Sequence, residues 1–210
     1  MANPPAERRR AAILAVRAVG YRRLAAANEE ETPTRLRLLR QRVIDPTIGV
    51  HRGHIVKSTG DGLLVLLSSA VDAVRCALAI QRAVDEHATD MPHARQIVFR
   101  IGIHFGDVVV HADADLIGDI AARLESITEP GGISLSRTAY DQVRGKLDLA
   151  VRDQGLQQLR NIAEPVQVFA IDRSDSAHSM RRFGSRVLRA ALAAVVAITA
   201  FIASAFWLTQ

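Results

Sequence analysis

The segment His54-Ile-Val-Lys-Ser-Thr-Gly-Asp-Gly-Leu-Leu-Val-Leu-Leu67 holds two apolar runs separated by a short loop with two glycines. This pattern predicts a β-hairpin with Asp61 at its tip. The glycines would also let a ligand approach the backbone, and a carboxylate there suits a hard cation that carries phosphates. Two interpretations therefore stay open from this segment alone. Asp61 is either a turn residue or a metal ligand, with Lys57 close by on the incoming strand.

The rest of the chain alternates between strand and helix patterns. Apolar periodicity and capping residues predict helices over 29–43 (N-capped by Asn28 and interrupted at Asp45-Pro46), 69–86 (capped by Ser69), 117–127 and 136–143. Strands are predicted over 11–19, 96–104, 108–111, 133–135, 147–159 and 166–171, with Gly106-Asp107 turning a second hairpin. This order predicts an α+β sheet with helices packed on one face. His104 and His111, on strand positions, are expected to be structural rather than catalytic.

Composition narrows the class of protein. The 210 residues suffice for one domain and an appendage, and the formal charge of +5 comes mainly from arginines near the two ends. Aromatic residues make up only 4% of the chain, so we expect no nucleic-acid partner. Cys76 is a single cysteine in an apolar helical pattern, which predicts a buried, unreactive thiol and no disulfide within the chain.

The C-terminal region suggests a membrane anchor. Residues 190–208 carry no charge and are numerous enough, as a helix, to cross a hydrocarbon core of about 30 Å. Four arginines precede them, which places residues 1–189 in the cytoplasm. We therefore expect a basic arm (1–10), a folded domain (11–172), a basic linker (173–189) and a single-pass transmembrane helix (190–208). The alternative is a buried C-terminal helix.

Several ordered motifs resemble the catalytic domain of bacterial class III adenylate/guanylate cyclases. The matching segments are Ala11-Ala-Ile-Leu-Ala15 with Gly20-Tyr21, Gly53-His-Ile-Val-Lys-Ser-Thr-Gly-Asp-Gly62, Phe99-Arg-Ile-Gly-Ile-His-Phe-Gly-Asp-Val108, Ala121-Ala-Arg-Leu-Glu125, Glu129-Pro-Gly-Gly-Ile-Ser-Leu-Ser136 and Leu159-Arg-Asn-Ile-Ala-Glu-Pro-Val166. The resemblance implies a ferredoxin-like nucleotidyl cyclase fold that pairs head to tail, with active sites between the two subunits. It also implies Mg²⁺ or Mn²⁺ as cofactor and conversion of ATP to cyclic AMP and pyrophosphate.

The resemblance assigns roles to five residues. Asp61 falls on the second metal aspartate of the family, Lys57 on the adenine-reading lysine and Asp115 on the adenine-reading aspartate. Arg123 falls on the transition-state arginine, and Arg160 stands where the family often has a lysine that contacts the triphosphate. These matches favour ATP over GTP.

Two departures stand against a complete site. Arg17 occupies the position of the first metal aspartate, and a guanidinium has no acceptor with which to ligate a cation. We expect it to lie beside Asp61, pair with it and repel a metal ion. Relatives also read roughly D-x-x-G-D-x-V-N-V-A-A-R, whereas here Asp119 runs directly into Ile120-Ala-Ala-Arg123, so three residues, including the transition-state asparagine, are missing.

Two functional hypotheses from different classes remain. The first is a membrane-anchored adenylate cyclase in intracellular signalling, with little activity as a homodimer. The second is a pseudo-cyclase that binds nucleotide or forms a heterodimer as a regulatory module. A subunit that supplies Lys57 and Arg123 to a partner carrying both metal aspartates would join the two.

Overall fold

The structure is a computed structural model that describes residues 8–89, 91–92, 96–109 and 119–172. These residues form a seven-stranded sheet in the order β2-β3-β1-β4-β5-β7-β6. The strands are β1 (Arg8–Ala18), β2 (His54–Ser58), β3 (Gly62–Leu67), β4 (Phe99–Val109), β5 (Ile133–Ser136), β6 (Val151–Gln157) and β7 (Val166–Ile171). Neighbouring strands are antiparallel except β4 and β5, which are parallel. The predicted α+β class is therefore confirmed.

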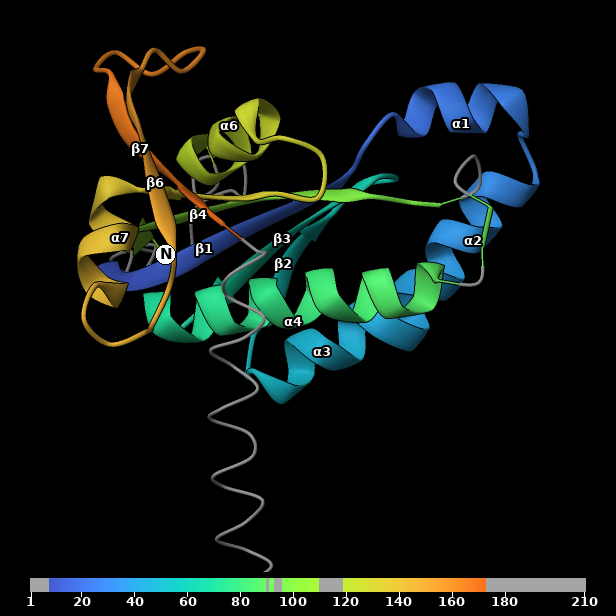
Figure 1. Cartoon of the computed structure of the whole chain (residues 1–210), viewed down its shortest axis with the longest axis horizontal. Coiled ribbons are helices and arrows are strands. Elements are labelled where there is room, and N and C mark those ends of the chain that lie inside the picture. Colours follow the sequence, from blue (N-terminus) through green and yellow to red (C-terminus); the bar gives the residue numbers. More distant parts are fainter. Residues whose placement is uncertain (1–7, 90, 93–95, 110–118, 173–210) are drawn as a thin grey trace, which may run out of the picture.

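The helices lie on both sides of this sheet (Figure 1). They are α1 (Tyr21–Ala27), α2 (Glu31–Leu39), the π-helix η1 (Arg40–Ile44), α3 (Asp45–Val50), α4 (Ala70–Ala88), α6 (Asp119–Ile127) and α7 (Arg137–Val143). Two serine side chains cap helices as expected: Ser69 Oγ accepts from the Asp72 N–H and Ser136 Oγ from the Ala139 N–H. Within the described residues no helix is both long enough and apolar enough to cross a bilayer, and the predicted span 190–208 lies outside them.

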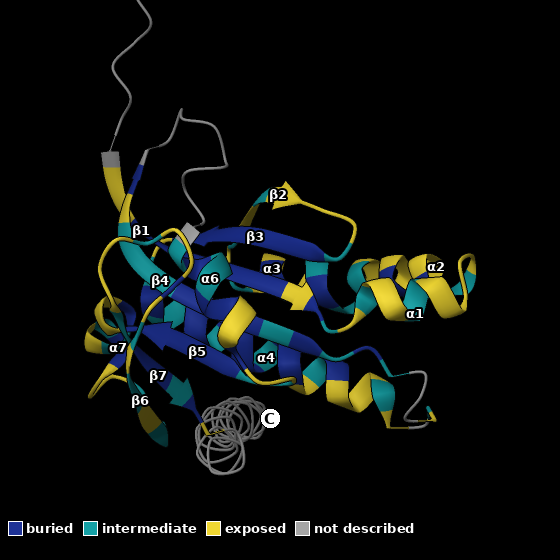
Figure 2. Ribbon diagram, turned by 90° about the horizontal axis from the view of Figure 1, so that it is seen from above, coloured by how far each residue is buried: buried dark blue, intermediate teal, exposed yellow. Residues whose placement is uncertain are grey.

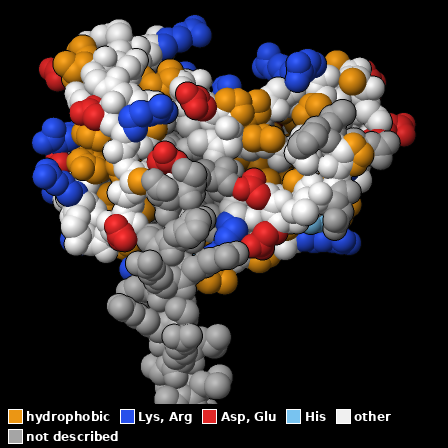
Figure 3. All heavy atoms as spheres, in the orientation of Figure 1, with side chains coloured by type: hydrophobic (Ala, Val, Ile, Leu, Met, Phe, Trp, Pro, Cys, Tyr) orange, Lys and Arg blue, Asp and Glu red, His pale blue; other side chains and the backbone are white. Residues whose placement is uncertain are grey.

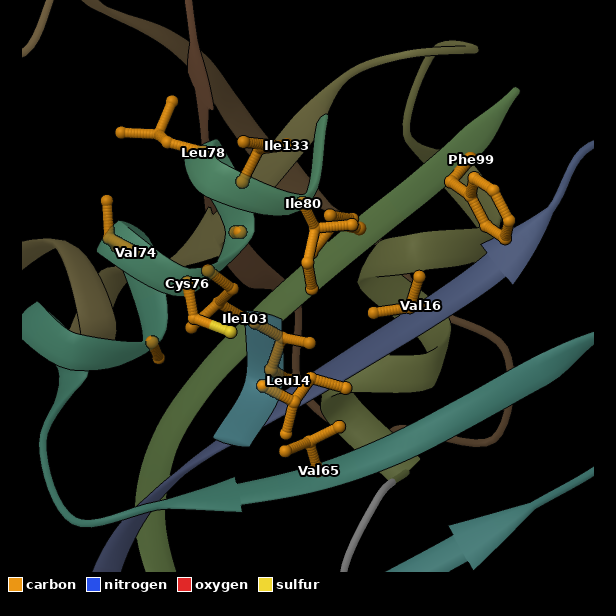
Figure 4. Close-up of a cluster of buried hydrophobic side chains, with 14 of the residues drawn as sticks. Leu14, Val16, Val65, Val74, Cys76, Leu78, Ile80, Phe99, Ile103 and Ile133 are labelled. Carbon is orange, nitrogen blue, oxygen red and sulfur yellow. The ribbon is translucent and has the colours of Figure 1, made fainter. Parts of the chain in front are cut away.

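Strand β1 is buried on both faces, as its unbroken apolar run predicts. Its alternate residues Ala12, Leu14 and Val16 belong to the main core, which α4 covers with Val74, Cys76 and Ile80. Figure 4 shows Leu14, Val16 and Val65 of the sheet meeting Cys76 and Ile80 of α4. The intervening residues Ala11, Ile13 and Ala15 form a second cluster with Ala121 of α6. In Figure 2, β1 and β3 are dark blue along most of their length.

Helix α6 covers the face of the sheet opposite α4, so the expectation that all helices pack on one face is wrong. Gly102 of β4 allows this contact. A Cβ at that position would lie 2.2 Å from the Ala121 carbonyl oxygen and 2.4 Å from the Glu125 backbone nitrogen. Because real Cβ atoms do not approach so closely, glycine sets how near α6 comes to the strand.

The second predicted hairpin is also wrong. Strand β4 continues through Gly106-Asp107 to Val109 and pairs with β1 in one unbroken register from Ala18↔Phe99 to Arg8↔Val109. The long partner strand supplies a hydrogen-bonding ladder on both sides of the expected turn, and Asp107 comes to lie opposite Arg10. Arg8–Arg10 thus belong to β1, although we expected them in a loose arm.

The helical segment before the hairpin does not stop at Asp45-Pro46. Helix α2 runs into the π-helix η1, in which the Asp45 N–H donates to the Arg40 carbonyl, and α3 follows with proline in its first turn. Proline fits there because the first turn of a helix leaves its N–H groups unpaired. The interruption predicted at Asp45-Pro46 is therefore a π-helical turn within a continuous helical segment.

Candidate functional site

Asp61 lies at the tip of the β2–β3 hairpin, as predicted. The Thr59 N–H donates to the Gly62 carbonyl at 2.9 Å, and Thr59 Oγ1 donates to Asp61 Oδ1 at 3.3 Å. The Ala18 N–H donates to the Asp61 carbonyl at 2.8 Å, which ties the hairpin tip to the end of β1. These bonds hold the Asp61 carboxylate beside the residues that end the central strand.

Arg17 is one of those residues, and it lies opposite Gly62 in the β1–β3 register. Its Nε is 3.0 Å from Oε2 of Glu125 on α6. The expectation that Arg17 pairs with Asp61 is therefore wrong. Side chains along a strand alternate between the two faces of the sheet. Arg17 therefore points to the same face as Ile13 and Ala15, which is the face that α6 covers.

Glu125 is the residue that the sequence did not single out. Its side chain is only 3% exposed. Burial raises its pKa above the ordinary value of 4.5, whereas the charges of Arg17 and Arg100 lower it and Asp61 raises it further. Helical spacing indicates this burial. Glu125 lies one turn after the buried Ala121 and therefore on the packed side of α6.

We call Arg17, Asp61, Arg100 and Glu125 the charged corner. Arg100 belongs to it because it is the β4 partner of Arg17 in the sheet register. The corner contains two guanidinium groups and two carboxyl groups, so its cations and anions balance internally. Arg17 is the outermost of the bonded pair, with half of its side chain exposed.

The charged corner does not fit a two-metal centre. Among the described residues there is no group of three or more His, Cys, Asp or Glu side chains that could hold a metal ion. Arg17 offers donors only, and Glu125 already accepts from it. A cation at Asp61 would also face the positive charge of Arg17 on the adjoining strand.

Two of the other predicted site residues, Lys57 and Arg160, lie at opposite edges of the sheet. Lys57 is exposed on the edge strand β2, just after a register shift between Ile55 and Lys57. Arg123 is half-buried on α6, and Arg160 is exposed after β6 at the other edge of the sheet. Six strand spacings separate β2 from β6, or roughly 29 Å at about 4.8 Å each. Asp115 and His111 lie outside the described residues.

His104 has a structural environment, in line with our expectation. Its Nδ1 lies 3.0 Å from Ser136 Oγ, the hydroxyl that caps α7. Burial lowers the pKa of His104 to about 4, so the ring is neutral at physiological pH. It connects β4 to the start of α7.

Charges on the surface are mixed. On the face shown in Figure 3, acidic side chains lie among the lysines and arginines. The excess positive charge of the sequence therefore does not form one continuous basic surface on this face of the described residues.

Comparison with known proteins identifies the relatives of this chain. The family described as "Adenylate and Guanylate cyclase catalytic domain" matches residues 8–172. A Rhizobium meliloti (strain 1021) protein named "Putative adenylate cyclase 3" is 42% identical over 180 residues, which are 84% of this chain and 30% of that protein. The chain thus matches less than a third of this relative's length.

Solved structures agree on the fold. The structure of an Adenylate/Guanylate Cyclase/Hydrolase from Silicibacter pomeroyi is 41% identical, with a TM-score of 0.73, and the match covers 79% of this chain and 98% of that one. The adenylyl cyclase CyaB from P. aeruginosa has a TM-score of 0.68 at 22% identity, with coverage of 79% and 95%, and so supports the fold alone.

Proposed function

Because this chain belongs to the family of adenylate and guanylate cyclase catalytic domains, we propose that it is an adenylate cyclase-type subunit that cannot complete a catalytic site by itself. Its role is to pair with a second cyclase domain that carries both metal aspartates. In such a pair one site works, and this chain contributes nucleotide-binding and transition-state side chains to it.

The observation that carries the proposal is the Arg17–Glu125 ion pair. The family generally uses Mg²⁺ or Mn²⁺, and the resemblance places a metal aspartate where Arg17 stands. The guanidinium is bonded into the fold rather than free to swing away. A homodimer would therefore present Arg17 in both of its sites.

The family resemblance supports a site shared between two chains, because it implies a head-to-tail pair with the active sites between the subunits. In such a pair the metal aspartates come from one subunit and the nucleotide-reading and transition-state side chains from the other. We assign adenine recognition to Lys57 and Asp115, transition-state stabilisation to Arg123 and triphosphate contact to Arg160, while Asp61 is the remaining carboxylate of the metal position.

The proposal includes a membrane location. Residues 190–208 form the anchor, 173–189 the linker, and the domain over 11–172 faces the cytoplasm. The uncharged composition of 190–208 and the arginines before it support this assignment. Alkaline carbonate washing of membranes tests it, since a spanning helix keeps the chain in the pellet and a peripheral protein is released.

Complementation tests the shared site. Wild-type chain is mixed with an Arg17→Asp/Arg123→Ala variant, which regains a metal aspartate and loses the transition-state arginine. With Mn²⁺ and ATP, the mixture is expected to make cyclic AMP at least about tenfold faster than either protein alone, since a lost transition-state donor typically costs about 10²–10³ in rate. Adding Lys57→Ala to the otherwise wild-type chain should abolish the gain.

Two outcomes would overturn the proposal. Robust cyclic AMP production by wild-type chain alone, abolished by Asp61→Ala, would show a self-sufficient enzyme. No gain on mixing would leave the second candidate, a catalytically inactive regulatory module. The Arg17–Glu125 pair at the metal position also favours this candidate. Nucleotide binding with no turnover in any mixture would then identify that role.

A metal-binding readout avoids dependence on turnover. Mn²⁺ is expected to shift the melting temperature of wild-type chain by less than about 1 °C and that of Arg17→Asp by about 3 °C or more, because binding to the folded state alone stabilises it. An equal shift in both proteins would contradict the assignment of Arg17 to the metal position.

A further inference from the structure

A pocket lies between the tip of the β2–β3 hairpin and helices α1 and α2. Its volume is about 420 Å³, which falls within the range of small-molecule sites. Figures 1 and 2 show the hairpin ending beside α1 and α2. We call it the hairpin pocket, and its polar lining comes from Tyr21, Thr34, Arg37, Arg40, Gln41 and Thr59.

The hairpin pocket is distinct from the charged corner. Leu36, which lines it, belongs to the main core on the α4 side of the sheet. The Arg17–Glu125 pair lies on the α6 side. Of the hairpin tip, the pocket includes Thr59 and Gly60. A molecule bound here would therefore contact the back of the hairpin rather than the face that carries the metal position.

The chemistry of the lining favours an anion. Two guanidinium groups, two threonine hydroxyls, an amide and a phenol can all donate hydrogen bonds. Asp45 is the acidic residue in the lining, and it lies beside Arg40, with Oδ1 3.7 Å from Nε. Arg37 is exposed on α2, and its positive charge adds to the excess. Arginine paired with hydroxyl groups is a typical arrangement for binding phosphate.

A hydrogen bond orients the Arg40 side chain for binding an anion. Its Nη1 donates to Ser58 Oγ at 2.8 Å, which fixes the guanidinium against β2. Its Nε is buried and makes no hydrogen bond within the described part of the chain, because the distance to Asp45 Oδ1 is too long for one. Asp45 Oδ1 is likewise buried without a hydrogen bond. A water molecule between the two atoms would satisfy both, and the Nη atoms of Arg40 are the donors left for an anion.

The backbone at Arg40 is also unusual. The π-helix η1 begins at Arg40, and such wide turns are rare and often mark functional sites. The same residue therefore combines an irregular helix, an unsatisfied buried donor and a hydrogen bond to the β2–β3 hairpin. From this combination we infer that the hairpin pocket binds a small phosphate-bearing anion through Arg37 and Arg40.

Binding in the hairpin pocket would affect Lys57, which is proposed to bind the nucleotide. Ser58, the partner of Arg40, directly follows Lys57 on β2. An anion that draws Arg40 into the pocket changes the bond that holds this strand. The inference does not depend on the proposed cyclase function, because binding is measured directly.

Isothermal titration calorimetry on the full chain in a mild non-ionic detergent tests the inference. The probes are sodium phosphate, sodium pyrophosphate and AMP, with sodium chloride at matched ionic strength as a blank. Arg37→Ala should weaken binding of the tightest probe by about tenfold, the usual effect of losing a charge-assisted hydrogen bond. Arg42→Ala is the matched control, since this exposed arginine of the same helical segment lines a different groove, and it should change affinity less than twofold.

The outcomes are separable. Tightest binding by pyrophosphate or phosphate supports the site and identifies an inorganic ligand, whereas tightest binding by AMP supports it and identifies a nucleotide. Binding that persists in Lys57→Ala supports a location behind the hairpin, and binding lost in that variant would overturn it. Equal weakening by Arg37→Ala and Arg42→Ala, or no saturable binding of any probe, would also overturn it.

Discussion

Arg17 on β1 and Glu125 on α6 form an ion pair of 3.0 Å that joins the central strand to the helix covering it. The arginine is half exposed to water, whereas the carboxylate is almost fully buried. A buried carboxylate is stable only when a cation or hydrogen bonds compensate for lost water. Arg17 therefore has a structural role at the position where the family resemblance implies a metal ligand.

Breaking this pair from the two sides should have unequal effects. Arg17→Ala is expected to lower the free energy of unfolding by about 1–3 kcal/mol, because it leaves a buried charge with less compensation. Glu125→Gln should cost less, since a neutral amide needs no counter-ion. A double-mutant cycle by urea denaturation measures their coupling, expected at about 1 kcal/mol. Simple additivity would show that the two side chains do not stabilise each other.

The pH dependence of stability should show the raised pKa of Glu125. Burial raises its pKa above 4.5 in the folded state, so the folded protein binds this proton more tightly than the unfolded chain does. Its contribution to stability is therefore greatest at low pH and falls as the pH rises through the interval above 4.5. The difference in unfolding free energy between wild type and Glu125→Gln, measured from pH 4.5 to 8, should show this fall. A difference independent of pH would contradict it.

His104 should produce the opposite slope. Burial lowers its pKa from 6.5 to about 4, so the unfolded chain binds the proton more tightly. Stability is then lost as the pH falls from 6.5 toward 4, by about 1.4 kcal/mol for each pKa unit that separates the two states. His104→Asn, which keeps a group near the Nδ1 position, should remove this loss. Comparing variant and wild type at each pH separates the effect from that of Glu125.

Gly102 should tolerate no side chain. Gly102→Ala would force α6 away from β4, at an expected cost of about 1–3 kcal/mol or more, because backbone atoms of Ala121 and Glu125 occupy the space. Gly49→Ala is the matched control, since a Cβ there meets nothing within 4 Å. This helical substitution should be neutral or stabilise the protein by about 0.4–1 kcal/mol. Thermal unfolding followed by circular dichroism compares the two, and equal effects would contradict the tight packing of α6.

Cys76 should be unreactive in the folded protein. It is fully buried, and burial raises the pKa of its thiol to about 12, so the thiolate that attacks disulfide reagents is scarce. Ellman's reagent at pH 8 should label no thiol in native protein and one per chain in urea, the single cysteine of the sequence. Rapid labelling without denaturant would show that α4 opens readily.

The hairpin and its neighbours were predictable because their signals are local. The glycines around Asp61, the capping serines Ser69 and Ser136 and the apolar run of β1 each specify their own structure, and the ordered motifs specify the family. The continuation of β4 past Gly106 was not predictable from its own residues. That turn signal was outweighed by a partner strand, β1, that is distant in the sequence.

The sequence by itself determined the α+β class, the family, the placement of Asp61 at a hairpin tip and the presence of an arginine where a metal ligand is expected. Only the tertiary structure decided which acid that arginine contacts. Side chains on a strand alternate between faces, so the partner of Arg17 depends on which helix covers its face. Gly102 lets α6 approach there, and this brings Glu125, more than a hundred positions along the chain, to Arg17 while Asp61 remains at the neighbouring tip.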